Sequence, residues 1–172
     1  MVPTLTTERL ILRAPHRDDF EDIYQLGTDP EVMRYISFGK VQTQREARKD
    51  LATRIRMSTG NTGYWIIQHG ETGAFIGWLA LKKLSKTKDY EIGFRLMRSA
   101  WGKGYATEGS RKLLDYAFWD LGLTKVLAVA MPENKASRRV LEKLGLNFQG
   151  TGEYYETHCV LYSIKKEEFE LV

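Results

Sequence analysis

The sequence is poor in the features that mark secreted, membrane-spanning and metal-binding proteins. It has one cysteine, Cys159, which excludes an intrachain disulfide and suits a reducing cytoplasm. No apolar run reaches the length of a membrane span, and the N-terminal residues lack a basic-then-apolar signal. The three histidines, His16, His69 and His158, stand apart without metal-ligand spacing. We therefore expect a cytoplasmic protein with no metal and no membrane partner.

The excess of basic over acidic residues is also small. The 26 basic and 22 acidic residues leave a net charge of +4, which suits an anionic ligand but falls short of a concentrated basic face. The basic residues that do gather lie in a helix expected over about 43–57, and a solvated face is the favoured interpretation of them. They are Arg45, Arg48, Lys49, Arg54 and Arg56. We therefore do not expect nucleic acid as a partner.

Two familiar phosphate-binding motifs are missing, yet a glycine-rich turn is present. The chain contains neither a Gly-x-x-x-x-Gly-Lys-Ser/Thr loop nor a dinucleotide-binding Gly-x-Gly-x-x-Gly after a first strand. Instead, Trp101-Gly-Lys-Gly-Tyr-Ala-Thr-Glu108 separates a β-type run, 90–97, from a helical run, 106–121. The unpaired N–H groups of a helix start attract anions. The turn is thus either a phosphate cradle or a tight turn without a ligand.

The remaining patterns predict one α/β domain that spans residues 1–172. A chain of this length builds one core comfortably and two poorly. Strand 90–97, helix 106–121 and strand 125–130 form a βαβ unit, so part of the sheet is parallel. The other expected strands are 8–14, 64–69, 74–82, 148–153 and 156–165, and the other expected helices are 18–27, 29–36, 43–57 and 134–144.

A second polar motif begins the helix that follows strand 125–130. Asn134 and Ser137 have the spacing of an N-cap, and capping alone would explain them. Their position gives them a further meaning, because this helix and the glycine turn both start at the carboxyl edge of parallel strands. Ligands of α/β proteins usually bind at that edge.

Together these motifs resemble the GNAT superfamily of acetyl-CoA-dependent N-acetyltransferases. The resemblance rests on Trp101 to Glu108, on Asn134-x-x-Ser137 and on Leu141-Glu-Lys-Leu-Gly145. Within the superfamily, the branch of the RimJ and RimL ribosomal-protein N-terminal acetyltransferases is the most similar. The segments that fit this branch are Thr7-Glu-Arg-Leu-Ile-Leu-Arg13, Asp29-Pro-Glu-Val-Met33 and Glu91-Ile-Gly-Phe94. The resemblance implies a mixed, splayed sheet of six to seven strands flanked by helices, with acetyl-CoA as co-substrate.

The resemblance also implies which residues hold acetyl-CoA. Backbone N–H groups from Gly102 to Thr107 would bind the pyrophosphate, and the backbone of strand 90–97 would pair with the pantetheine arm. Asn134 would bond the pantetheine side, and two basic side chains would meet the adenosine phosphates. The implied residues are Phe94, Leu96, Met97, Arg98, Gly102, Lys103, Gly104, Tyr105, Ala106, Thr107, Asn134 and Ser137.

The sequence departs from the superfamily at two positions. Trp101 stands where the loop usually begins with Gln or Arg, a variation typical of the RimJ/RimL-like branch. Leu141 stands where many relatives carry the tyrosine that protonates the leaving thiolate, so Ser137 or water must do that work. Glu91 is our candidate for the base, and a strand carboxylate in an outward salt bridge is the alternative.

The sequence limits the identity of the acceptor only through the pKa of its ammonium group. A peptide α-amine has a pKa of about 8 and lysine one of about 10.4, so lysine costs about 3 kcal/mol more to deprotonate at neutral pH. A peptide or protein N-terminus is therefore favoured. A small-molecule amine, a non-catalytic acyl-CoA-binding module and a homodimer are left open. Tyr154, Tyr155 and Tyr162 could line an acceptor pocket or simply pack, and Cys159 is expected to be a buried, inert thiol.

Overall fold

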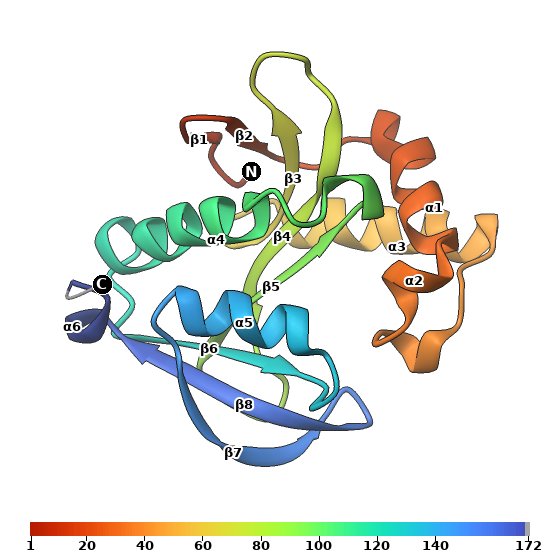
Figure 1. Ribbon diagram of the computed structural model, residues 1–172. Helices are drawn as coiled ribbons and strands as arrows, with labels where there is room; N and C mark the ends of the chain where they lie inside the picture. Colours follow the sequence, from red (N-terminus) through yellow and green to blue (C-terminus); the bar gives the residue numbers. More distant parts are fainter. Residues whose placement is uncertain (171–172) are drawn as a thin grey trace. The chain divides into compact units, whose positions relative to one another are not determined.

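The computed structural model describes residues 1–170, which divide into two compact units. The first unit comprises Met1–Ala80 and Phe94–Tyr105, and the second comprises 81–93 and 106–170. The chain forms one eight-stranded sheet in the order β1-β2-β3-β4-β5-β6-β8-β7, labelled in Figure 1. The sheet is mixed, as predicted, and the strand beyond the expected six to seven is the two-residue β1.

The first unit contains the N-terminal strands and three α-helices. Its elements are β1 (Leu5–Thr6), β2 (Leu10–Arg13), α1 (Phe20–Thr28), α2 (Pro30–Met33), α3 (Gln44–Met57), β3 (Gly63–His69), the beginning of β4 (Phe75–Lys83) and the end of β5 (Tyr90–Leu96). Short 3₁₀ turns occupy Arg17–Asp19, Ser37–Gly39 and Arg98–Ala100. Strands β1, β2 and β3 pair antiparallel, and the short loop after His69 leads into β4.

Helix α3 begins where the sequence predicts it. Thr43 Oγ1 accepts a hydrogen bond from the Glu46 N–H at 3.2 Å, and Glu46 Oε2 accepts one from the Thr43 N–H at 2.8 Å. This reciprocal cap satisfies two donors that a helix start leaves unpaired. The apolar side of the helix, represented by Leu51, packs with Ile23 of α1 and Ile66 of β3 in one buried cluster. The predicted solvated face is only partly correct, because Arg54 is buried while its four basic neighbours are exposed or nearly so.

The second unit contains the parallel part of the sheet and its C-terminal strands. Its elements are the end of β4, the beginning of β5, α4 (Tyr105–Asp115, which starts in the first unit), β6 (Lys125–Ala130), α5 (Lys135–Lys143), β7 (Asn147–Tyr154), β8 (Thr157–Lys165) and α6 (Lys166–Phe169). Strand β5 pairs with β6 in parallel at Tyr90 and Glu91, which confirms the βαβ unit. Strand β8 lies between β6 and β7 and pairs antiparallel with both, and α5 packs against β6 (Figure 1).

The helix after the glycine turn, α4, was predicted to be regular to its end but finishes in a π turn. The apolar spacing predicts a regular helix to residue 121, whereas residues 116–120 form a wider π turn, closed by the Leu121 N–H on the Tyr116 carbonyl at 3.1 Å. The fully buried Phe118 lies in this turn, where its ring packs on that of Phe169 at 5.3 Å. Residues 116–120 thus form a single π turn at the end of an α-helix, the form in which π-helical hydrogen bonds mostly occur in proteins.

Candidate active site

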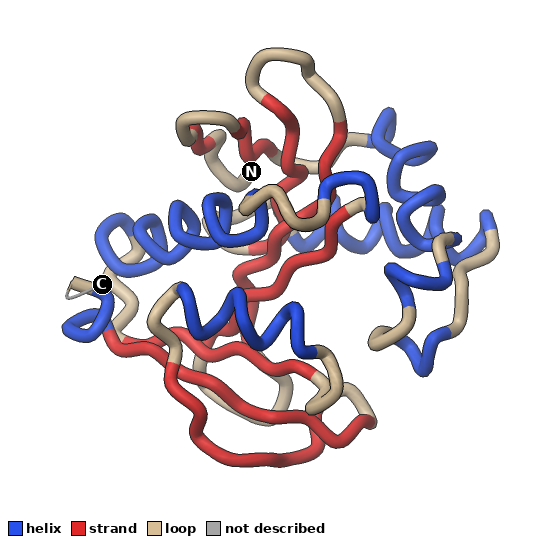
Figure 2. Tube along the Cα trace, viewed as in Figure 1, coloured by secondary structure: helices blue, strands red, loops and turns tan. Residues whose placement is uncertain are grey.

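The glycine-rich turn is an exposed loop of the first unit, drawn in tan ahead of α4 in Figure 2. Gly102 and Gly104 have φ of 71° and 80°, in the left-handed region that glycine enters without steric cost. The N–H groups of residues 102–104 make no hydrogen bond of standard geometry to the rest of residues 1–170. A run of free N–H groups in such a conformation is a concave anion site. The loop therefore fits the pyrophosphate that the resemblance assigns to it.

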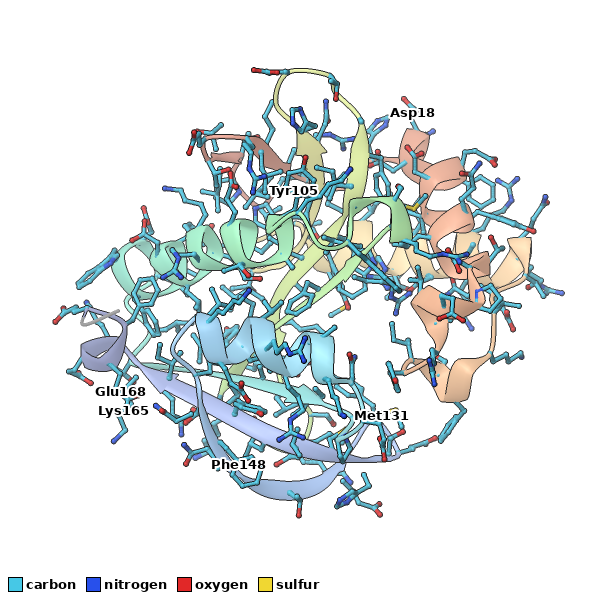
Figure 3. The ribbon with its side chains drawn as sticks, in the orientation of Figure 1. Asp18, Tyr105, Met131, Phe148, Lys165 and Glu168 are labelled. Atoms are coloured by element: carbon cyan, nitrogen blue, oxygen red, sulfur yellow. The ribbon has the colours of Figure 1, made fainter. Side chains whose placement is uncertain are left out.

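Arg9, immediately before β2, brings a positive charge to this loop. Its Nη1 donates to the carbonyl of Lys103 at 2.9 Å, and its guanidinium lies 4.5 Å from the ring centroid of Tyr105, which Figure 3 labels. The other ring contact of Tyr105 is with His69 at 6.1 Å. Sequence analysis missed Arg9, because 94 residues separate it from Lys103 and no local pattern links the two.

Some of the expected cofactor groups are already engaged within the first unit. Arg98 forms a two-point ion pair with Asp29, from Nε to Oδ2 at 3.0 Å and from Nη2 to Oδ1 at 2.9 Å. Met97 donates its N–H to the Ile76 carbonyl at 2.8 Å and accepts from the Ala100 N–H at 2.9 Å. The Leu96 carbonyl accepts from Trp101 Nε1 at 3.0 Å. Three backbone positions, Phe94, Leu96 and Met97, were expected to pair with pantetheine. Of these, only Phe94 makes no hydrogen bond outside the pairing between strands.

Glu91 lies in a polar cluster of the second unit. It is 5% exposed, and its Oε1 accepts hydrogen bonds from Lys82 Nζ at 2.7 Å and from the Tyr155 hydroxyl. Lys82 also bonds the Tyr155 hydroxyl and lies 4.8 Å from the Tyr155 ring centroid. Burial raises the pKa of Glu91, and the charge and hydrogen bond of Lys82 oppose the rise. The expected outward salt bridge is thus an inward one, with a tyrosine as third member.

A strained turn carries Tyr155 into this cluster. Tyr155 and Glu156 join β7 to β8 with φ of 54° and 60°, although neither is a glycine or an asparagine. Two such residues in a row give the turn that suits a two-residue hairpin. Left-handed backbone costs a non-glycine residue roughly 1–2 kcal/mol, and strain of this kind gathers at functional sites. The sequence offers no hairpin signal here, so the partnership of Tyr155 with Glu91 was not foreseeable.

The start of α5 has the predicted cap. Asn134 Oδ1 accepts from the Ser137 N–H at 3.2 Å, which leaves the amide NH₂ of Asn134 and the hydroxyl of Ser137 for other partners. Leu141, at the position of the usual tyrosine, is 2% exposed and packs in the core. Arg138, the residue after Ser137, donates from Nε to the Tyr162 hydroxyl at 3.0 Å, and Tyr162 is 1% exposed, so Tyr162 is a buried packing residue.

Neither Cys159 nor any group of possible metal ligands among residues 1–170 forms a reactive site. Cys159 is buried, and its thiol lies 3.8 Å from the Tyr154 carbonyl, as an inert thiol would. Within residues 1–170, no three His, Cys, Asp or Glu side chains are grouped so as to hold a metal ion. None of the helices in this part of the chain is both long and apolar enough to cross a bilayer.

Comparison with known proteins agrees with these features. Residues 9–147 match the acetyltransferase (GNAT) domain family, a range that includes residues of both units. The chain is 34% identical over 183 residues to the FsC-acetyl coenzyme A-N(2)-transacetylase of Aspergillus fumigatus, with 97% of this chain and 78% of that protein covered. The family is therefore shown by sequence.

Solved structures give the same result. A GNAT-family acetyltransferase from Bacillus anthracis has a TM-score of 0.85 at 26% identity, covering 96% of this chain and 99% of that one. RimL, a ribosomal L7/L12 alpha-N-protein acetyltransferase in complex with coenzyme A, has a TM-score of 0.80 at 16% identity, covering 95% and 98%. An identity that low shows the fold alone, so the RimJ/RimL branch is not established. The family model and the relative from Aspergillus fumigatus show that the chain belongs to the GNAT family and is an N-acetyltransferase whose co-substrate is acetyl-CoA.

Proposed function

We propose that this enzyme acetylates an α-amino group and that Glu91 removes the proton from that amine. The observation that carries the proposal is the environment of the Glu91 carboxylate. Its Oε1 is held by Lys82 and Tyr155, whereas Oε2 accepts no hydrogen bond from any side chain or backbone group of residues 1–170. One oxygen is therefore fixed in place, and the other is left to accept a proton.

The raised pKa of Glu91 suits this role. A general base works best when its pKa approaches the operating pH, and burial moves the carboxylate in that direction. Lys82 keeps the carboxylate charged, so that it enters the reaction in the form that accepts a proton. Tyr155 donates to the same oxygen and acts as a positioning residue. The proton moves from the acceptor ammonium to Oε2, directly or through one water, and leaves a neutral amine that attacks the acetyl carbonyl.

The α-amine is the acceptor that this base handles most easily. An α-ammonium with a pKa of about 8 needs far less help to lose its proton than a lysine with a pKa of about 10.4. Two comparisons support the assignment through their names, since one protein is an N(2)-transacetylase and the other an alpha-N-protein acetyltransferase. A protein or peptide N-terminus, as in RimL, and a small molecule with an α-amine both satisfy this chemistry.

We assign the binding of acetyl-CoA to the glycine loop, to β5 and to the start of α5. The N–H groups from Gly102 to Thr107 would hold the pyrophosphate, with Lys103 and Arg9 adding positive charge. The backbone of Phe94 and the amide NH₂ of Asn134 would hold the pantetheine arm. When bound, acetyl-CoA supplies the activated acetyl group. We further propose that residues 1–172 act as one acetyltransferase domain, since the family match includes both units.

The leaving sulfur needs a proton, and Ser137 is our candidate donor. Leu141 has no proton to give, whereas the hydroxyl of Ser137 is half-buried and makes no hydrogen bond within residues 1–170. A thiolate with a pKa near 8.5 also takes a proton readily from water at neutral pH. Ser137→Ala should therefore lower kcat only a few-fold if water substitutes for the hydroxyl.

The function is tested by following thiol release from acetyl-CoA with short peptides, polyamines and aminoglycosides as acceptors. Glu91→Gln keeps the size of the side chain but removes the proton acceptor, so kcat should fall about 10²- to 10⁴-fold. The dissociation constant of acetyl-CoA should stay within about twofold of the wild type. Equal loss of turnover and of acetyl-CoA affinity would remove Glu91 from the proton-transfer step. Tight acetyl-CoA binding without acetylation of any amine would make the protein a binding module.

A further inference from the structure

An amine of the protein itself lies beside the proposed base. Lys82, near the end of β4, places its Nζ 2.7 Å from Oε1 of Glu91 and also bonds the Tyr155 hydroxyl. All three residues belong to the second unit, and the Lys82 side chain is 20% exposed. A group that takes a proton from an amine must come within hydrogen-bond distance of it. Lys82 and Glu91 meet this condition without any contact from the first unit.

The carboxylate of this pair differs from those beside other lysines. The acidic side chains paired with Lys40, Lys112 and Lys125 are 38–45% exposed, whereas that of Glu91 is 6% exposed. In water, lysine holds its proton about six pKa units more tightly than glutamate does. Burial narrows this gap, because it raises the pKa of Glu91 and favours a neutral acid and a neutral amine over two charges. A proton therefore passes from Lys82 to Glu91 at a lower cost than it would to an exposed carboxylate.

We propose that Lys82 is a self-acetylation site: when no acceptor amine is bound, the enzyme transfers the acetyl group of a thioester to Lys82 Nζ. The C–N bond of the amide forms as the C–S bond of the thioester breaks. The lysine ammonium loses two protons in all, one through Glu91 to solvent and one to the departing sulfur. With acetyl-CoA, the products are acetyl-lysine, coenzyme A and one proton. The inference rests on the proposed role of Glu91 as the base.

Acetylation of Lys82 changes the chemistry of the base. It removes the positive charge of the side chain, and that charge now opposes the rise in the pKa of Glu91. Without it, Glu91 stays protonated up to a higher pH, and a protonated carboxylic acid takes no proton from an acceptor amine. Self-acetylation therefore lowers turnover. The effect is greatest when acetyl-CoA is plentiful and the acceptor is scarce, because the two amines compete for the same acetyl group.

The first test compares Lys82 with its neighbour Lys83 in the same polypeptide. The wild type is incubated with acetyl-CoA alone, and peptide mass spectrometry follows acetylation at both residues. Lys83 is exposed and makes no ion pair within residues 1–170, so uncatalysed acetylation should favour it. Lys82 should instead react about 10²-fold faster, the lower end of what a positioned base contributes. An equal or lower rate at Lys82, or a rate constant that rises with protein concentration, would overturn self-acetylation.

Substitution of each lysine tests the effect on turnover. Lys82→Arg keeps a cation beside Glu91 but removes the amine, and each variant is compared with its own starting activity. Preincubation with acetyl-CoA should lower the activity of the wild type in proportion to the modified fraction, whereas Lys82→Arg should show no decline. Lys83→Arg is the matched control and should decline as the wild type does. A parallel decline in Lys82→Arg would overturn the link between this modification and turnover.

A smaller thioester separates this inference from the proposed function. S-Acetyl-N-acetylcysteamine lacks the nucleotide part of acetyl-CoA, so its reaction does not depend on the glycine loop. It should acetylate Lys82 ahead of Lys83, and Glu91→Gln should remove this preference. The same result without acetylation of any free amine would overturn the α-amine proposal and leave self-acetylation standing. Acetylation of free amines with Lys82 unmodified by either thioester would overturn self-acetylation and leave the proposed function standing.

Discussion

The glycine loop and the Glu91 cluster are made of different parts of the chain. The loop presents backbone N–H groups, and its conformation depends on two glycines two positions apart, Gly102 and Gly104. The cluster presents side chains, and its members come from three strands or turns, 9 and 64 residues from Glu91 along the chain. The loop is exposed and its N–H groups from 102 to 104 make no internal hydrogen bond, whereas the side chains of the cluster are paired around a buried Glu91.

This contrast explains why the two regions should fail differently. A backbone site tolerates changes of side chain and is sensitive to backbone conformation, so its damage appears as weaker ligand binding. A buried charged cluster depends on every partner, so its damage appears in stability and in proton transfer. The variants below test whether damage to the loop weakens acetyl-CoA binding and damage to the cluster lowers stability and turnover.

Lys82→Met should have the largest effect, because it leaves Glu91 buried without its cation. Removal of one partner of a buried pair costs about 3–5 kcal/mol, and the lower part of that range fits Lys82, which is one-fifth exposed. The pKa of Glu91 should rise further, since Lys82 now opposes that rise. Urea unfolding should therefore show the deficit fully at pH 8 and less of it as the pH falls and Glu91 becomes protonated.

The pH–rate profile gives a second readout of the same change. Glu91 must be deprotonated to act as a base, so kcat/KM should rise with pH through its pKa, and this acid limb should move to higher pH in Lys82→Met. Lys83→Met, at the exposed neighbouring position, is the control and should leave the limb in place. An unchanged limb in both variants would show that the cluster does not set the protonation of the base.

Gly104→Ala should have an intermediate effect, confined to acetyl-CoA binding. Alanine at φ of 80° is strained by roughly 1–2 kcal/mol, so acetyl-CoA affinity should fall about 5- to 30-fold with kcat nearly unchanged. Gly60→Ala is the matched control, because an added Cβ there meets open space and no positive φ is required. Equal losses in the two variants, measured by titration calorimetry, would mean that the loop conformation is not what holds the ligand.

Tyr155→Phe should have the smallest effect. It removes the hydroxyl that bonds Glu91 and Lys82 but keeps the ring 4.8 Å from Lys82 Nζ. Loss of one hydrogen bond to a charged group should lower kcat about 3- to 10-fold, without a change in acetyl-CoA affinity. Tyr154→Phe, whose hydroxyl touches neither residue, should behave as the wild type in steady-state kinetics. A larger loss in Tyr155→Phe than in Glu91→Gln would make Tyr155, not Glu91, the principal proton-handling group.

Local signals made much of the fold predictable. The capping box at Thr43 and Glu46, the N-cap at Asn134 and the parallel pairing of β5 with β6 were all expected from spacing alone. Each of these features depends on residues close in sequence or on a general rule of chain connection. The glycine loop belongs to this class, because its conformation needs only its own residues.

The candidate site was less predictable wherever it depends on distant partners. Glu91 was chosen from sequence, but neither Lys82 nor Tyr155 was connected to it. Arg98 was expected to meet phosphate, and its ion pair with Asp29, 69 residues away, was not connected to it. Arg54 was grouped with a solvated face and is buried. Electrostatic pairing follows from tertiary contacts, and a single sequence carries no pattern for them.

The burial of Cys159 has a consequence for an enzyme that handles a thioester. A reactive thiolate can attack a thioester and take its acetyl group, with release of the coenzyme A thiolate, because the thiolate is the nucleophilic form of cysteine. Burial raises the pKa of the Cys159 thiol, and the negative charge of Glu91 raises it further. The carboxylate proposed to activate the amine therefore also helps to keep the protein's single sulfhydryl group protonated and unable to capture the acetyl group.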